Sequence, residues 1–118
     1  MNSRKFLLAI VASGAAATSL ACDYPALITV PDGESSTMEE LIVAQTAVRN
    51  YMVGMESYLA CVTAELDAAG SNAPAEYKAI MFSRHNAAVA EMEAIADSFN
   101  EQVQAYREAN PDADPNDG

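Results

Sequence analysis

Two cysteines, one histidine and a group of methionines are the side chains of this sequence best suited to chemistry. Cys22 and Cys61 are the only cysteines, and His85 is the only histidine among 118 residues. Two cysteines can form a disulfide, and thioether or imidazole groups can bind the soft ion copper(I). Two cysteines do not make a zinc site, and no glycine-rich phosphate loop is present. No nucleophile, base and orienting group stand together, so we predict that the protein is not an enzyme and needs no cofactor.

The chemistry of Cys22 depends on the segment before it. Residues 1–21 have the pattern of a secretory signal peptide, with Arg4 and Lys5 ahead of an apolar run over residues 6–12. Residues 19–21, Ser-Leu-Ala, match the small-x-small rule for cleavage. The sequence therefore predicts an exported protein, periplasmic or extracellular, whose mature chain begins at Cys22.

Three fates are open to Cys22 after export. A lipoprotein signal also ends at a cysteine, but it has leucine three residues earlier, where this chain has Ser19. An even number of cysteines in an exported protein favours a Cys22–Cys61 disulfide. Lipid attachment at Cys22 is the alternative, and two free thiols are the third. Unless Cys22 is lipidated, we expect no stable membrane anchor.

The charge of the chain restricts its partners. After residue 21 the sequence has four basic residues and 17 acidic ones, which leaves a net charge of −13. Such a surface repels nucleic acid and anionic membranes. It suits solubility, a basic partner or cations.

Four stretches follow the signal peptide. The first contains Pro25, Pro31 and Gly33 and is predicted to be an extended clasp segment, because two prolines prevent a continuous helix. Two long helical patterns come next, and an acidic, proline-containing tail ends the chain. The predicted bounds are 22–35 for the clasp segment, 37–69 and 74–109 for the helices of a hairpin over 36–110, and 111–118 for a disordered tail.

Each helix has recognisable end signals. Ser36 with Glu39 three residues later predicts a capping box at the first helix, and Gly70 predicts a left-handed C-cap. Pro74 suits the first turn of the second helix. Because only about four residues join the helices, they must fold back on each other as an antiparallel hairpin.

A heptad seam runs along both helices and predicts how they pack. Apolar residues recur in alternating steps of four and three, with two glutamines and His85 among them, which is typical of coiled coils. We therefore predict an all-α fold, a long antiparallel two-helix coiled-coil-like hairpin with the clasp segment packed along it. The seam positions are Leu41, Gln45, Val48, Met52, Met55, Leu59, Val62 and Leu66, then Met81, His85, Ala88, Met92, Ile95, Phe99, Gln102 and Tyr106.

A groove beside the first seam is predicted to receive the clasp segment. Ala47 and Gly54 lie in line with Cys61 at steps of seven, and their small side chains allow another backbone to approach. Tyr51 and Tyr58 flank this line. The extended segment is long enough to bring Cys22 back to Cys61. Tyr24, Leu27, Ile28 and Val30 are available to fill the groove.

The same stretch resembles a group of small exported bacterial proteins with no assigned activity. Their pattern is Cys-x-x-Pro and Pro-Asp-Gly, followed by a helix with Tyr-Leu-x-Cys; here these motifs begin at Cys22, Pro31 and Tyr58. The resemblance covers roughly residues 22–61. It implies export and paired cysteines, and it implies no activity.

Two further groups carry hypotheses. Met52, Met55, Met92 and His85 lie on the seam and could bind copper, although helical methionines are usually core filler. On the side of the second helix away from the groove, a line of apolar residues at steps of seven is a candidate interface for a protein partner or a homodimer. We call it the apolar strip; its members are Phe82, Val89, Ala96 and Val103.

The leading functional prediction is an interaction or structural module. The alternative is a periplasmic protein that handles copper or a divalent cation, through the methionines or the acidic surface.

Overall fold

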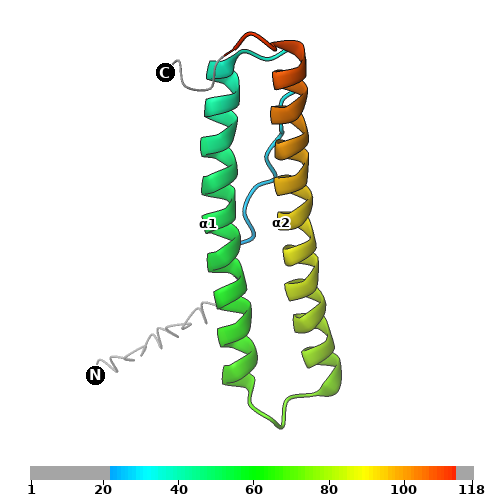
Figure 1. The fold of residues 1–118 in the computed structure, drawn as a ribbon. Coiled ribbons are helices and arrows are strands. Elements are labelled where there is room, and N and C mark those ends of the chain that lie inside the picture. The colour runs from blue at the N-terminus through cyan, green and yellow to red at the C-terminus, as the bar shows by residue number, and fades with distance from the viewer. Residues whose placement is uncertain (1–21, 114–118) are drawn as a thin grey trace, which may run out of the picture.

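The structure is a computed structural model, and it describes residues 22–113. The predicted signal peptide and residues 114–118 of the predicted tail lie outside the described residues. Two helices, α1 (Met38–Ala69) and α2 (Ala75–Ala109), run antiparallel as a hairpin, and the segment before α1 lies along them (Figure 1). The described part contains no strand. The predicted all-α hairpin is confirmed.

The cap of α1 is one residue later than predicted. The Thr37 hydroxyl accepts from the Glu40 backbone N–H at 3.2 Å, and the Glu40 carboxylate accepts from the Thr37 N–H at 3.0 Å, which completes a capping box. The predicted box of Ser36 and Glu39 is therefore wrong. Both pairs have the required spacing, but the Ser36 hydroxyl is used elsewhere, since it donates to the Asp32 carbonyl at 2.5 Å.

The turn between the helices occupies residues 70–74. Gly70 has φ of 75°, which favours glycine, but its ψ of 178° is extended, so the predicted left-handed C-cap is only half right. Pro74 is the N-cap of α2 and lies just before the first helical residue, where its missing N–H costs nothing.

The core combines seam positions with the groove beside them. Met55 on the seam is fully buried, and Tyr51 and Tyr58, which were expected at the edge of the groove, are buried too. Met52 and Leu59 on the seam are only partly buried, so the core extends toward the face that the clasp segment covers. A third layer there removes water from positions that a bare two-helix hairpin would leave exposed.

The clasp segment fills the groove with only some of its side chains. Ile28 packs against the core, whereas Leu27 is 71% exposed. The expectation that Leu27 helps to fill the groove is wrong, because neighbouring side chains of an extended segment point to opposite sides. Within residues 22–113, neither helix has an apolar stretch of the length and hydropathy that a membrane span requires.

Candidate functional site

A disulfide joins the clasp segment to the C-terminal third of α1. Cys22 and Cys61 are bonded through their sulfur atoms, and their Cα atoms are 5.6 Å apart, within the usual range for such a bond. The bonded sulfur of Cys22 is not available for a lipid thioether. The predicted pairing is confirmed.

The small residues of the groove do allow a close approach. A Cβ atom added at Gly54 would lie 2.9 Å from Cγ of Pro25, which is closer than real Cβ contacts. Ala47 is half-buried in the same line. The glycine in the middle of α1 therefore has a packing role that offsets its poor helix propensity.

The second anchor of the clasp segment is a carboxylate on α2. The Tyr24 and Tyr51 hydroxyls both donate to Glu91, Tyr51 at 2.6 Å. The Tyr24 ring meets the Tyr58 ring edge-on, with centroids 4.8 Å apart. Glu91 was not among the residues that the sequence singled out. It is half-buried, and one carboxylate holds tyrosines from the clasp segment and from α1.

This cluster shifts the acidities of its members. The hydroxyl of Tyr24, followed by that of Tyr51, lowers the pKa of Glu91, although burial opposes the change. Burial, followed by the hydrogen bond to Glu91, raises the pKa of Tyr24 to about 12. The same two causes raise the pKa of Tyr51. The folded protein therefore keeps Glu91 ionised and both phenols protonated.

We predict a stability profile with two pH limits. The free energy of unfolding should fall as the pH drops below about 4.3, the ordinary glutamate pKa, because unfolded Glu91 takes up a proton more readily than folded Glu91. It should fall again as the pH rises from about 10, where unfolded tyrosines ionise first. Thermal melts of the parent, Glu91→Gln and the control Glu93→Gln check this. The acid limb should be reduced only in Glu91→Gln, and equal acid slopes in all three would contradict the role of Glu91.

A third anchor explains the Pro-Asp-Gly motif. The Gly33 N–H donates to Oε1 of Gln102 at 2.8 Å, and a Cβ at Gly33 would overlap the Gln102 carbonyl group. Oδ1 and Oδ2 of Asp32 accept from the Glu34 N–H and the Ser35 hydroxyl at 3.2 and 3.1 Å, which shapes the following turn. The clasp segment therefore contacts both helices, where sequence reasoning placed it along the first alone.

The methionines lie mainly in the core. Met55 and Met81 are fully enclosed, and Met52 and Met92 pack against the same cluster. His85 is half-buried. Their thioethers fill space between the helices, as flexible side chains commonly do.

One carboxylate lies near the disulfide. Among residues 22–113, the only three His, Cys, Asp or Glu side chains whose ligand atoms converge are Cys22, Cys61 and Glu65. The two sulfur atoms are bonded to each other, so they are not free to bind an ion. The metal-handling hypothesis gains no ligand set from these residues.

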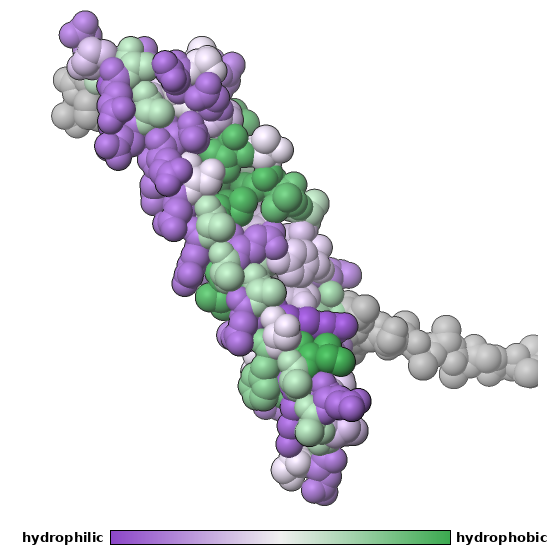
Figure 2. Space-filling model, turned by 90° about the vertical axis from the view of Figure 1, so that its right-hand side faces the viewer, coloured by the Kyte–Doolittle hydropathy of each residue, from purple (hydrophilic) through white to green (hydrophobic). Residues whose placement is uncertain are grey.

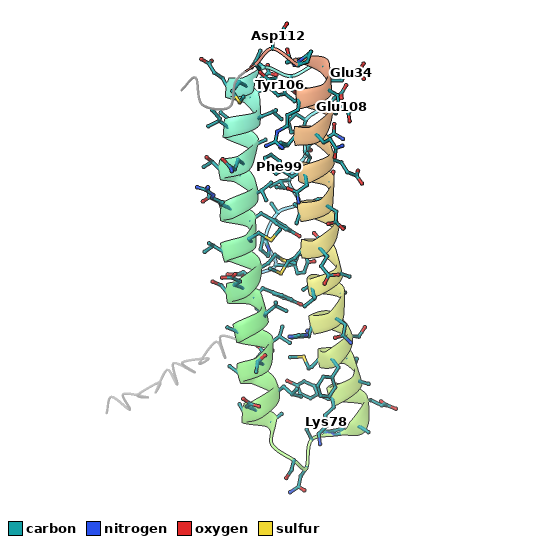
Figure 3. The ribbon with its side chains drawn as sticks, viewed as in Figure 1. Glu34, Lys78, Phe99, Tyr106, Glu108 and Asp112 are labelled. Carbon is teal, nitrogen blue, oxygen red and sulfur yellow. A yellow bond between two sulfur atoms is a disulfide. The ribbon has the colours of Figure 1, made fainter. Side chains whose placement is uncertain are left out.

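A second candidate site lies at the open end of the hairpin, where α1 begins and α2 ends. It is a hollow of about 440 Å³, which we call the open-end hollow. Figure 3 shows Phe99 and Tyr106 of α2 near this end, between the helices. Gln45, Arg107 and Asn110 are its polar lining residues. Its main apolar lining residues are Met38, Leu41, Ile42, Phe99, Val103 and Tyr106.

The apolar strip leads toward this hollow. Phe82 is 56% exposed, and Val89, Ala96 and Val103 are half-buried. Val103 also lines the open-end hollow. By its heptad positions, the strip flanks the seam of α2 on the side opposite Glu91, which holds the clasp segment. The interface hypothesis for the strip stays a prediction.

Comparison with known proteins adds no relative. No family model, curated protein or solved structure matches this chain. The resemblance to small exported bacterial proteins stays a prediction, and the functional proposal depends on the sequence and geometry of this chain.

Sequence reasoning missed two parts of the site. The only sequence feature that could have identified Glu91 is its position. It lies next to the seam, on the side that faces the clasp segment. No sequence pattern pointed to the open-end hollow, since its wall combines seam residues such as Leu41 with Ile42 from outside the seam.

Proposed function

We propose that this protein is an exported interaction module without catalytic activity, which binds another molecule through the side of the hairpin opposite the clasp segment. The observation that carries the proposal is the open-end hollow, an apolar recess of about 440 Å³ on a small acidic protein. Recesses of this size and lining are typical of binding sites. The signal-peptide pattern and the disulfide support export.

Large apolar side chains are exposed at the hollow and on the strip. Figure 2 views the molecule from the side of α2 and shows a mainly polar surface with apolar side chains among the polar ones. Ile42 at the hollow is 54% exposed, and Phe82 on the strip is 56% exposed. Large apolar side chains left in water on so small a domain are typical of contact surfaces.

Binding of a neutral apolar dye tests the hollow. Nile red should gain fluorescence with the parent, and Ile42→Glu should weaken its binding about tenfold, because a charge enters the apolar wall. Val53→Glu is the matched control, since Val53 is 62% exposed on the same helix and does not line the hollow. Absence of dye binding to the parent, or equal losses in both variants, would overturn the proposal.

Association tests the apolar strip. We expect Phe82→Glu combined with Val89→Glu to abolish self-association or partner binding by the parent while leaving the helical circular dichroism unchanged. Sedimentation velocity of the parent and the double variant gives the oligomeric state. If the double variant unfolds, the strip belongs to the core. If the parent is monomeric and captures no partner, the strip is not an interface.

A further inference from the structure

Within the part of the chain that the structure describes, one charged residue lines the open-end hollow. Arg107 is that residue, and the remaining polar lining consists of neutral amides and of hydroxyl or backbone groups. Among residues 22–113, no carboxylate lines the hollow. An apolar wall with a single guanidinium beside it has the character of a site for a molecule that is apolar at one end and anionic at the other.

Arg107 is unusual because cations are scarce in this chain. Only four basic residues follow residue 21. Lys78 donates to the Ser71 carbonyl at 2.9 Å near the turn, and Arg84 lies beside Met81. Arg107 is in the last turn of α2, where any cation would favour the helix end. A cation stabilises the helix end from any face of the helix. Arg107 lies on the face that lines the hollow.

Resting on the proposed function, we propose that the open-end hollow binds a single-chain carboxylate amphiphile of the fatty-acid class. Its alkyl chain lies among Met38, Leu41 and Phe99, and its carboxylate pairs with Arg107. A guanidinium is matched in shape to a carboxylate and can donate two parallel hydrogen bonds to it. A volume of about 440 Å³ is within the range of small-molecule sites.

The charge of the rest of the protein makes this proposal easy to contradict. Exposed carboxylates such as Glu108 and Asp112 dominate the surface and would attract a cationic amphiphile. At physiological salt, such exposed charges are screened beyond about 8 Å. A headgroup in the hollow therefore interacts mainly with Arg107. Two amphiphiles of equal chain length and opposite charge distinguish pairing with Arg107 from general attraction to the acidic surface.

The experiment is displacement of Nile red from the full disulfide-bonded mature protein. Sodium dodecanoate and dodecylammonium chloride are compared below their micellar concentrations, with the parent and with Arg107→Gln, Arg107→Lys and Arg84→Gln. Dodecanoate should displace the dye from the parent. Arg107→Gln should weaken dodecanoate about tenfold, the loss expected for one charge-assisted pair, when each displacement is corrected for the dye affinity measured with that same variant. Arg107→Lys should retain most of the binding, and Arg84→Gln all of it.

The outcomes separate this inference from the proposed function. If Nile red binds and dodecanoate does not displace it, the carboxylate inference fails and the proposed function stands. If dodecylammonium displaces the dye at least as well as dodecanoate, or if Arg107→Gln leaves dodecanoate unaffected, the inference also fails. If Nile red itself does not bind, the proposed function fails with it. Circular dichroism of each variant verifies that the hairpin is intact.

Discussion

Removal of the disulfide should destabilise this protein by about 4 kcal/mol, which is the chain-entropy value for a loop of this length. Cys22 and Cys61 are 39 residues apart, and the bond ties the first described residue to the C-terminal third of α1. In a double Cys22→Ser, Cys61→Ser variant, the unfolded chain regains the freedom that the bond removes. For a domain of this size the thermal midpoint should fall by roughly 15–30 °C.

Reduction of the parent provides the matched control. Dithiothreitol should lower the midpoint of the parent to that of the double variant and should leave the double variant unchanged. Hydrogen exchange adds a local readout, since the Gly33 N–H, which donates to Gln102, should lose protection before the amides of α1. Equal midpoints for the parent and the double variant would show that the bond contributes nothing to the fold.

Gly54→Leu should destabilise the protein by about 1–3 kcal/mol, the usual cost of overfilling a packed site. Leucine forms helices better than glycine by about 1 kcal/mol, so an open surface would give the opposite sign. The substitution should destabilise the protein because Pro25 lies where the new side chain must begin, with its Cγ 2.9 Å from an added Cβ. A proline ring cannot swing aside like the end of a long side chain. Urea unfolding followed by circular dichroism measures the difference.

A second substitution on α1 controls for helix propensity. Ala60→Leu places leucine on an exposed face of the same helix, and it should be nearly neutral. Combining Gly54→Leu with the disulfide-free variant provides a double-mutant cycle, because a released clasp segment leaves room at residue 54. The leucine should then cost less than it does in the parent. If Gly54→Leu stabilises the parent, the clasp segment does not lie over this glycine.

The anchors of the clasp segment explain why a two-helix hairpin can have an ordered core. Two helices alone bury one stripe each, which is little for a stable domain. The disulfide, the Tyr24–Glu91–Tyr51 cluster and the Gly33–Gln102 hydrogen bond hold a third layer against both helices. This layer covers one side of the hairpin only. The other side retains the apolar strip and the open-end hollow, which is why we place the binding function there.

Local patterns in the sequence determined the main features of the fold. The heptad seam, Gly70, Pro74 and the short connection were sufficient to predict two long helices and their reversal, because helix periodicity and turn chemistry act over a few residues. The disulfide and the contact at Gly54 were also predictable. Each depends on the distance that an extended chain can span and on which residues lie in line along one helix. Both follow from the fixed rise per residue of strands and helices.

Tertiary structure alone decided which side chains met across elements. Two capping boxes were available one residue apart, and the hydrogen bond from Ser36 to Asp32 left Thr37 as the cap. Glu91 could have been a solvated carboxylate, and its role arises because the clasp segment brings Tyr24 to it from 67 residues away. The open-end hollow depends in the same way on how the ends of both helices meet. Such features depend on the relative placement of distant segments, which no local periodicity encodes.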